Sequence, residues 1–151
     1  MLWYLLDRIT ECDPGKTITA TKCFTRSEEI FQHHFVNYPI VPGVLQIEMI
    51  AQAGGKCIKV YDGQLAPALA SVKKAKFYQS IFPGDKCEVK AQVIQLTSQY
   101  ALCTGTITVD GKKKASAEIL YSFLDPKVSS KLVPDEIVEE WKAKQKALGK
   151  E

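Results

Sequence analysis

The sequence is poor in the residues that build metal sites and disulfide frameworks. It has only two histidines, which are adjacent, and an odd number of widely spaced cysteines without a Cys-x-x-Cys pair. The cysteines are Cys12, Cys23, Cys57, Cys87 and Cys103. This pattern argues against a disulfide framework or a zinc site and favours reduced thiols in a cytoplasmic compartment. We therefore expect no bound metal, and all five cysteines to serve in packing.

The sequence also lacks long apolar runs and a strong charge of one sign. No stretch approaches the length of a membrane span. The first apolar segment ends at Asp7 without a basic leader or a small-residue cleavage site, so we expect a first strand or packing segment rather than a signal peptide. The net charge of +3 is too small to indicate nucleic acid as the main partner. A length of 151 residues is enough for one domain with its own core.

Hydrophobic periodicity predicts an α+β fold. One long helix, from residue 43 to about 60, is apolar nearly all round and is therefore expected to be buried on most sides. Strands are predicted at 17–24, 68–79, 87–93, 100–109 and 115–123. Asp110-Gly111 predicts a two-residue hairpin, and Pro83-Gly84 fits the centre of a type II turn. The prediction is an antiparallel sheet wrapped around one helix.

A second helix is expected near the C-terminus, between Pro134 and Leu148. Acidic residues lie in its first half and lysines in its second half, which complements the helix dipole. Asp125-Pro126 marks a boundary before it. We therefore divide the chain into a main domain, residues 1–124, and a C-terminal helical extension, residues 125–151, that docks against the sheet or another subunit or covers a substrate channel.

The residues most suggestive of chemistry lie at the start of the long helix. Glu48 is the only charged residue between His34 and Lys56. A carboxylate on an apolar helix is costly to bury unless it is paired or neutralised. A nearby histidine would supply a partner, and the two together would supply an acid and a base. Taken alone, His34 could be a structural residue, and Glu48 could be a helix carboxylate that simply reaches solvent.

Two short lysine clusters are open to two interpretations. They are Lys73-Lys74-Ala75-Lys76 and Lys112-Lys113-Lys114. Lysines beside turns are commonly just solvated surface residues. The alternative is a docking surface for an acidic partner or a phosphate group.

These residues carry a resemblance to a known family. The motifs are Leu6-Asp7-Arg8, His34-Phe35, Pro39, Pro42-Gly43-Val44-Leu45, Glu48, Ala51-Gln52-Ala53, Lys76-Phe77, Phe82-Pro83-Gly84-Asp85 and Thr108-Val109-Asp110-Gly111. In this order they resemble the β-hydroxyacyl-acyl-carrier-protein dehydratases of fatty acid synthesis. The resemblance covers roughly residues 3 to 124 and implies a hotdog fold, in which a sheet wraps around one helix.

The resemblance also implies an activity and the residues that perform it. The expected reaction removes water from 3-hydroxyacyl thioesters on acyl carrier protein and yields trans-2-enoyl thioesters. His34 would act as the base and Glu48 as the acid, each from a different subunit. The backbone N–H of Gly43 would polarise the thioester carbonyl, with Phe35 and Val44 also at the substrate. No cofactor is implied; the partners are acyl carrier protein with its phosphopantetheine-linked chain and further copies of the chain, in a homodimer or hexamer.

The chain departs from the family pattern in the loop after His34-Phe35. The family usually has Pro-Gly where this chain has Val36-Asn37. Asparagine tolerates a left-handed backbone better than most residues, so the loop can keep its shape. Tyr38 adds bulk near the expected substrate entrance.

Two other functions remain open on the sequence alone. One is an acyl thioesterase of the same fold, which would use a carboxylate and a water molecule and would not need His34. The other is a non-catalytic protein that binds acyl thioesters, against which the presence of both His34 and Glu48 argues.

Overall fold

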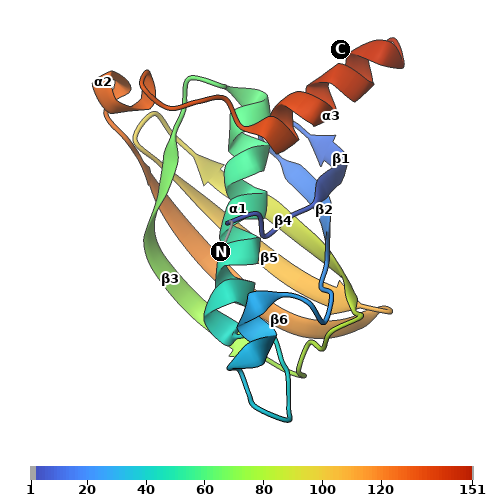
Figure 1. Cartoon of the computed structure of the whole chain (residues 1–151). Coiled ribbons are helices and arrows are strands. Elements are labelled where there is room, and N and C mark those ends of the chain that lie inside the picture. Colours follow the sequence, from blue (N-terminus) through green and yellow to red (C-terminus); the bar gives the residue numbers. More distant parts are fainter. Residues whose placement is uncertain (1–2, 151) are drawn as a thin grey trace.

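The computed structural model describes residues 3–150 and shows one curved sheet around one long helix (Figure 1). Met1, Leu2 and Glu151, the outermost residues of the two predicted parts, lie outside the described residues. The strands are β1 Arg8–Asp13, β2 Thr17–Cys23, β3 Pro67–Phe77, β4 Lys86–Leu96, β5 Tyr100–Val109 and β6 Lys112–Phe123. The helices are α1 Gly43–Tyr61, α2 Pro126–Ser129 and α3 Glu136–Ala147, with a 3₁₀ turn, η1, at Glu29–Gln32.

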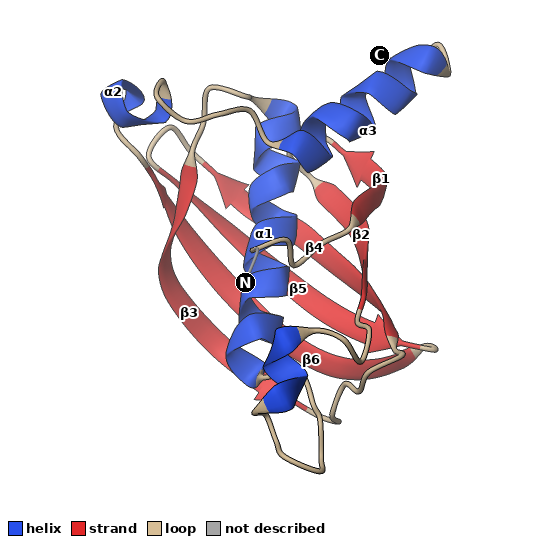
Figure 2. Cartoon of the chain, viewed as in Figure 1, coloured by secondary structure: helices blue, strands red, loops and turns tan. Residues whose placement is uncertain are grey.

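The sheet is antiparallel at every junction, in the order β1-β2-β4-β5-β6-β3. Figure 2 shows how it curls so that its concave face holds α1. β3 is therefore an edge strand, although it is eleven residues long. This is the hotdog arrangement, and the predicted fold class is confirmed.

The sequence periodicities match the local structure. In β5, buried and half-buried residues alternate along the whole strand, as expected when one face packs on a core. Asp110 and Gly111 both have positive φ, 50° and 76°, which is the backbone that a tight two-residue hairpin requires. Gly84, at a φ of 94°, occupies the turn position that was predicted for it.

The C-terminal segment docks on its own protomer. α3 lies against α1 and β1, where Ile137 and Val138 are buried. Leu148, the last residue of the predicted helix, is 68% exposed, so only the first half of α3 packs. The short α2 was not predicted, although Asp125 caps it by accepting from the Lys127 N–H and Pro126 suits a first turn.

The prediction that the cysteines serve in packing holds for four of the five residues and is wrong for Cys23. Cys57, Cys87 and Cys103 are buried, and burial raises the pKa of both Cys87 and Cys103 to about 12. Cys12 is half-buried against Cys57, which raises the pKa of the Cys12 thiol. Cys23 is exposed because it is the last residue of β2, where the alternation turns its side chain away from the core.

Two adjacent glycines in α1, Gly54 and Gly55, differ in the space available for a side chain. A Cβ on Gly54 would overlap the hydroxyl group of Tyr121 and lie 3.1 Å from the sulfur of Cys103. That hydroxyl donates to the Ala51 carbonyl at 2.6 Å and so cannot easily move. A Cβ on Gly55 would meet only Pro67, at an ordinary 3.6 Å.

We therefore predict opposite effects for the two alanine substitutions. Gly54→Ala should destabilise the protein by about 1–3 kcal/mol through overpacking against the sheet. Gly55→Ala should stabilise it by up to about 1 kcal/mol, because alanine is the better helix former. Urea unfolding of both variants measures this. Equal destabilisation by the two substitutions would contradict the assignment of the close approach to Gly54.

Candidate active site

The loop that carries His34 is closed by hydrogen bonds between its two ends. The Ile40 N–H donates to the His34 carbonyl at 2.9 Å, and His34 Nδ1 lies 3.1 Å from the Ile40 carbonyl oxygen. Within the loop, the backbones of Phe35 and Tyr38 bond to each other in both directions. Asn37 has a φ of 67°, the left-handed backbone that asparagine tolerates.

These bonds fix the tautomer of His34. A carbonyl oxygen only accepts hydrogen bonds, so the proton lies on Nδ1, which donates it to Ile40. In the neutral ring Nε2 then has a free lone pair. The imidazole also stacks on the Phe35 ring, with centroids 4.1 Å apart, and is half-buried. The loop thus orients the ring so that, in its neutral form, Nε2 is the basic nitrogen.

The loop leads directly into α1. The Gln46 side chain donates to the Val41 carbonyl at 3.1 Å, which ties the end of the loop to the helix. Pro42 precedes the helix and provides no side-chain cap, and the first amides of a helix have no acceptor within it. Gly43 is the first helical residue, so its N–H lies at the helix N-terminus, where the free amides and the helix dipole favour an anion.

The helix start is also closely packed. A Cβ on Gly43 would lie 3.1 Å from the ring of Phe77 on β3, so a larger residue would push this ring away. Val44 and Phe35, expected at the substrate, are 73% and 52% exposed, so both are available for contact.

Glu48 lies one and a half turns further along α1 and is half-buried. Its Oε1 atom accepts two hydrogen bonds, from the Trp3 indole N–H and from the Gln52 amide, each at 3.0 Å. Gln52 also donates to the Trp3 carbonyl and accepts from the Leu5 N–H, so it holds the N-terminal segment as well as the carboxylate. Both donors meet one oxygen, and Oε2 is left for other chemistry.

Glu48 stands at one end of a groove of about 150 Å³, hereafter the Glu48 groove. Its lining comes from α1, β3, β6 and the residue that caps α3. The residues are Glu48, Ala51, Gln52, Gly55, Lys56, Lys59, Pro67, Leu69, Tyr121 and Asp135. Asp135 forms ion pairs with Lys56 at 2.9 Å and with Lys59 at 3.5 Å.

His34 and Glu48 are not partners within one protomer. Across residues 3–150, no hydrogen bond or ion pair joins them, since His34 bonds to Ile40 and Glu48 to Trp3 and Gln52. The sequence motif includes Gln52 but gives no sign of Trp3 or Asp135. Neither has a local motif, because their contacts span 45 and 79 residues of sequence.

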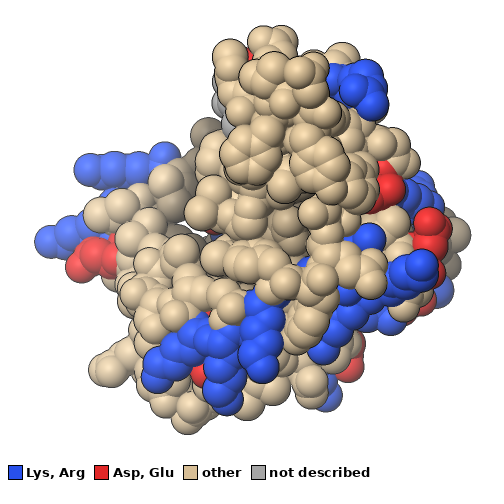
Figure 3. Space-filling model, turned by 90° about the horizontal axis from the view of Figure 1, so that it is seen from below, with Lys and Arg blue, Asp and Glu red and all other residues tan. Residues whose placement is uncertain are grey.

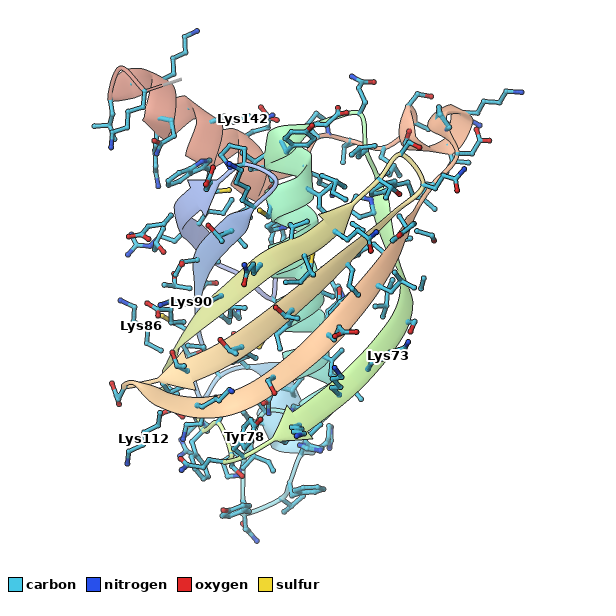
Figure 4. All side chains as sticks on the ribbon, turned by 180° about the vertical axis from the view of Figure 1, so that it is seen from behind. Lys73, Tyr78, Lys86, Lys90, Lys112 and Lys142 are labelled. Atoms are coloured by element: carbon cyan, nitrogen blue, oxygen red, sulfur yellow. The ribbon has the colours of Figure 1, made fainter. Side chains whose placement is uncertain are left out.

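The two lysine clusters come together on neighbouring strands. β3 pairs with β6 so that Lys76 faces Ser116, and the Tyr78 N–H donates to the Lys114 carbonyl at 2.8 Å. Lys74 forms an ion pair with Glu118 at 3.8 Å. Figure 3 shows Lys and Arg side chains gathered on the face seen from below. In Figure 4, Lys112 lies at the β5–β6 hairpin, Lys73 part-way along β3 on the other side of the sheet, and Lys142 at the opposite end of the molecule on α3.

Other kinds of site find little support in the described chain. Among residues 3–150, no group of three or more His, Cys, Asp or Glu side chains could hold a metal ion. No helix in this part of the chain is long and apolar enough to cross a membrane.

Comparison with solved structures places the protein in the hotdog class. It superposes on the dehydratase heterocomplex ApeI:P from Xenorhabdus doucetiae with a TM-score of 0.68, at 13% identity over 82% of this chain and 84% of that one. A hypothetical thioesterase with coenzyme A from Streptococcus pneumoniae gives 0.64, at 12% identity over 78% and 84%. At such identities these similarities show the fold alone.

Sequence comparison narrows the class to one family. A family model described as ApeI-like, ApeI dehydratase, matches residues 10–117. The 3-hydroxyacyl-[acyl-carrier-protein] dehydratase FabZ of Clostridium acetobutylicum is 39% identical over 78% of this chain and 84% of its own length. The FabZ of Enterococcus faecalis is 36% identical over 78% and 84%. The chain belongs to this dehydratase family.

The Asp135 contacts give a testable prediction about stability. Burial opposes ionisation of Asp135, but the hydrogen bond and charge of Lys56, with the amide of Val138 and the charge of Lys59, outweigh it and lower the pKa of the carboxyl group. A lowered pKa in the folded state stabilises the protein above the unfolded-state pKa, and this contribution is lost as the pH falls through the folded value.

Asp135→Asn should therefore lower the free energy of unfolding at pH 7 by about 2 kcal/mol, since asparagine keeps the helix cap but loses the charge. The difference from wild type should shrink as the pH falls below about 4. Urea unfolding at several pH values measures it, with Asp125→Asn, the cap of α2, as the matched control. A difference that is independent of pH would contradict the ion pair.

Proposed function

We propose that the protein catalyses the dehydration of 3-hydroxyacyl thioesters carried on acyl carrier protein, as a hydro-lyase of fatty acid or related acyl-chain biosynthesis. The observation that carries the proposal is a pair of side chains positioned for proton transfer. A histidine has its basic nitrogen free, and a glutamate has one oxygen held by two N–H donors. Curated relatives at 35–39% identity bear the name of this activity.

The chemistry follows from these groups. His34 Nε2 takes the proton from the carbon beside the thioester carbonyl, and the electron pair forms the new double bond. Glu48 acts in its acid form: it gives a proton from Oε2 to the hydroxyl group on the next carbon, which leaves as water. The Gly43 N–H stabilises the negative charge that develops on the carbonyl oxygen. Transfer of the proton from His34 back to Glu48 restores the enzyme.

We propose that the His34 of one subunit works with the Glu48 of another. Within one protomer the two side chains bond to different partners. β3 offers a surface for a second copy, because it is a long edge strand and carries exposed Leu69, Val72 and Phe77. An unpaired edge with apolar side chains favours pairing with another chain. A dimer, alone or in a trimer of dimers, would then form the complete site.

We assign the main domain to residues 1–124 and regard residues 125–151 as an accessory extension. The sheet and α1 are complete by Phe123, and the family model ends before it. The free cysteines suit a reducing compartment, so we propose that the protein works in the cytoplasm.

An acyl thioesterase is the main alternative, since thioesterases share the fold. The test is to incubate the protein with 3-hydroxyacyl thioesters and to follow the product by mass spectrometry. We expect the loss of one water and an intact thioester. Release of a free thiol without loss of water would favour the thioesterase, and binding without turnover would favour a non-catalytic protein.

The shared site predicts complementation between two inactive variants. His34→Ala and Glu48→Ala should each reduce kcat by about 100-fold or more, because each removes one proton-transfer group. After subunit exchange, a mixture should recover about a quarter of wild-type activity, since half the dimers are hybrids with one intact site. Exchange is followed with differently tagged chains. Confirmed exchange without recovery would refute the shared site.

We also propose that the lysines around the β3–β6 pair recruit acyl carrier protein through its acidic surface. Lys73→Glu with Lys76→Glu should raise the KM for the carrier-bound substrate about tenfold, because steering between opposite charges is lost. The KM for a pantetheine thioester should change little. Lys144→Glu with Lys146→Glu, exposed on α3, is the matched control. Equal effects on carrier and pantetheine substrates would leave these lysines as ordinary surface residues.

A further inference from the structure

The Glu48 groove ends at a residue outside the region that the family model matches. One end is the carboxylate of Glu48, and the other is Asp135, which caps α3 and lines the same groove. The family model stops at residue 117. A residue of the C-terminal extension therefore shares a cavity with the proposed acid.

Asp135 is held rigidly at this end. One oxygen, Oδ1, accepts from the Ile137 and Val138 amides, which starts the helix. The other, Oδ2, accepts from Lys56 and Lys59, which stand on α1 two and three turns after Glu48. The Asp135 and Lys56 side chains are only 14% and 12% exposed. A second contact fastens the same helix, because the Tyr4 hydroxyl donates to Glu136 at 2.9 Å.

We propose that the ion pair of Asp135 with Lys56 closes the far end of the Glu48 groove and so limits the length of the acyl chain that the enzyme accepts. This inference rests on the proposed function. It assigns a specificity-determining role to Asp135 and to the extension that carries it.

Part of the groove lining can contact the distal carbons of an alkyl chain. Ala51, Gly55, Pro67 and Leu69 present apolar atoms there, beside the polar side chains of Gln52, Lys56 and Lys59. Its volume of about 150 Å³ equals that of an engineered protein cavity that holds benzene, so it has room for about six carbons. With the hydroxyl-bearing carbon at Glu48, this corresponds to chains of about nine carbons.

A longer chain would have to displace the ion pair or press against it. Replacing the water around two paired charges with methylene groups removes their remaining hydration without a compensating hydrogen bond. For scale, one extra methylene group in a hydrophobic pocket changes the specificity constant by about 10-fold or more.

The experiment measures kcat/KM for pantetheine thioesters of 3-hydroxy acids with four, eight, twelve and sixteen carbons. Wild type should accept four and eight carbons and fall at least tenfold at twelve. Asp135→Ala removes the cap and both ion pairs, and should raise the ratio of twelve to eight carbons at least tenfold. Gly55→Ala places a methyl group beside Pro67 inside the groove, and should lower the ratio of eight to four carbons about tenfold.

The controls separate this inference from the proposed function. Asp125→Ala, which removes the cap of α2 outside the groove, should keep the wild-type length profile. If Asp135→Ala does not fold, Gly55→Ala still tests the groove, since it lies in ordinary contact distance. Length profiles identical in wild type and the folded groove variants would overturn the inference. If no substrate loses water, the proposed function itself is overturned.

Discussion

The rest of the structure depends on the packing of α1 into the curled sheet. Most faces of this helix are buried, so its polar side chains lie on the face that the sheet leaves uncovered, apart from Gln46, which is buried and donates to the Val41 carbonyl. Glu48, Gln52, Lys56 and Lys59 follow one another at spacings of four, four and three residues, which places them on one stripe. The N-terminal segment and α3 lie outside the sheet and α1. The first forms hydrogen bonds with residues of this stripe, and the cap of α3 forms an ion pair with one of them.

This stripe explains why an acid can be built on an apolar helix. A carboxylate facing the sheet would have no partners, whereas one on the open face can accept N–H donors. Trp3 and Gln52 donate hydrogen bonds to Glu48, and Lys56 forms an ion pair with Asp135. A structure described as a hypothetical thioesterase shares the sheet and helix with this protein. One fold can therefore carry different sets of polar side chains, and function has to be argued from those side chains rather than from the fold.

The sequence was sufficient for α1, α3 and five of the strands, and for the residues with local signals, whereas β1 and the short α2 were not predicted. The Asp110-Gly111 turn, the span of α1 and the loop of His34 each depend on neighbours a few residues away, so short patterns reveal them. The contacts of Trp3 with Glu48 and of Asp135 with Lys56 depend on how distant segments pack. A sequence pattern shows that such residues are polar or aromatic, but it does not show which partners the fold brings to them. The exposure of Cys23 was missed for a different reason, because the strand alternation at the end of β2 turns its side chain away from the core.

The hydrogen bond between Trp3 and Glu48 has an optical consequence. The protein contains two tryptophans, and the other, Trp141, belongs to α3. Indole emission responds to a nearby carboxylate and to the polarity around the ring. In a chain with Trp141→Phe, the single remaining indole would report directly on the state of the Glu48 carboxylate. The segment that holds the carboxylate in place therefore also provides an intrinsic fluorescent probe of the site, without any attached dye.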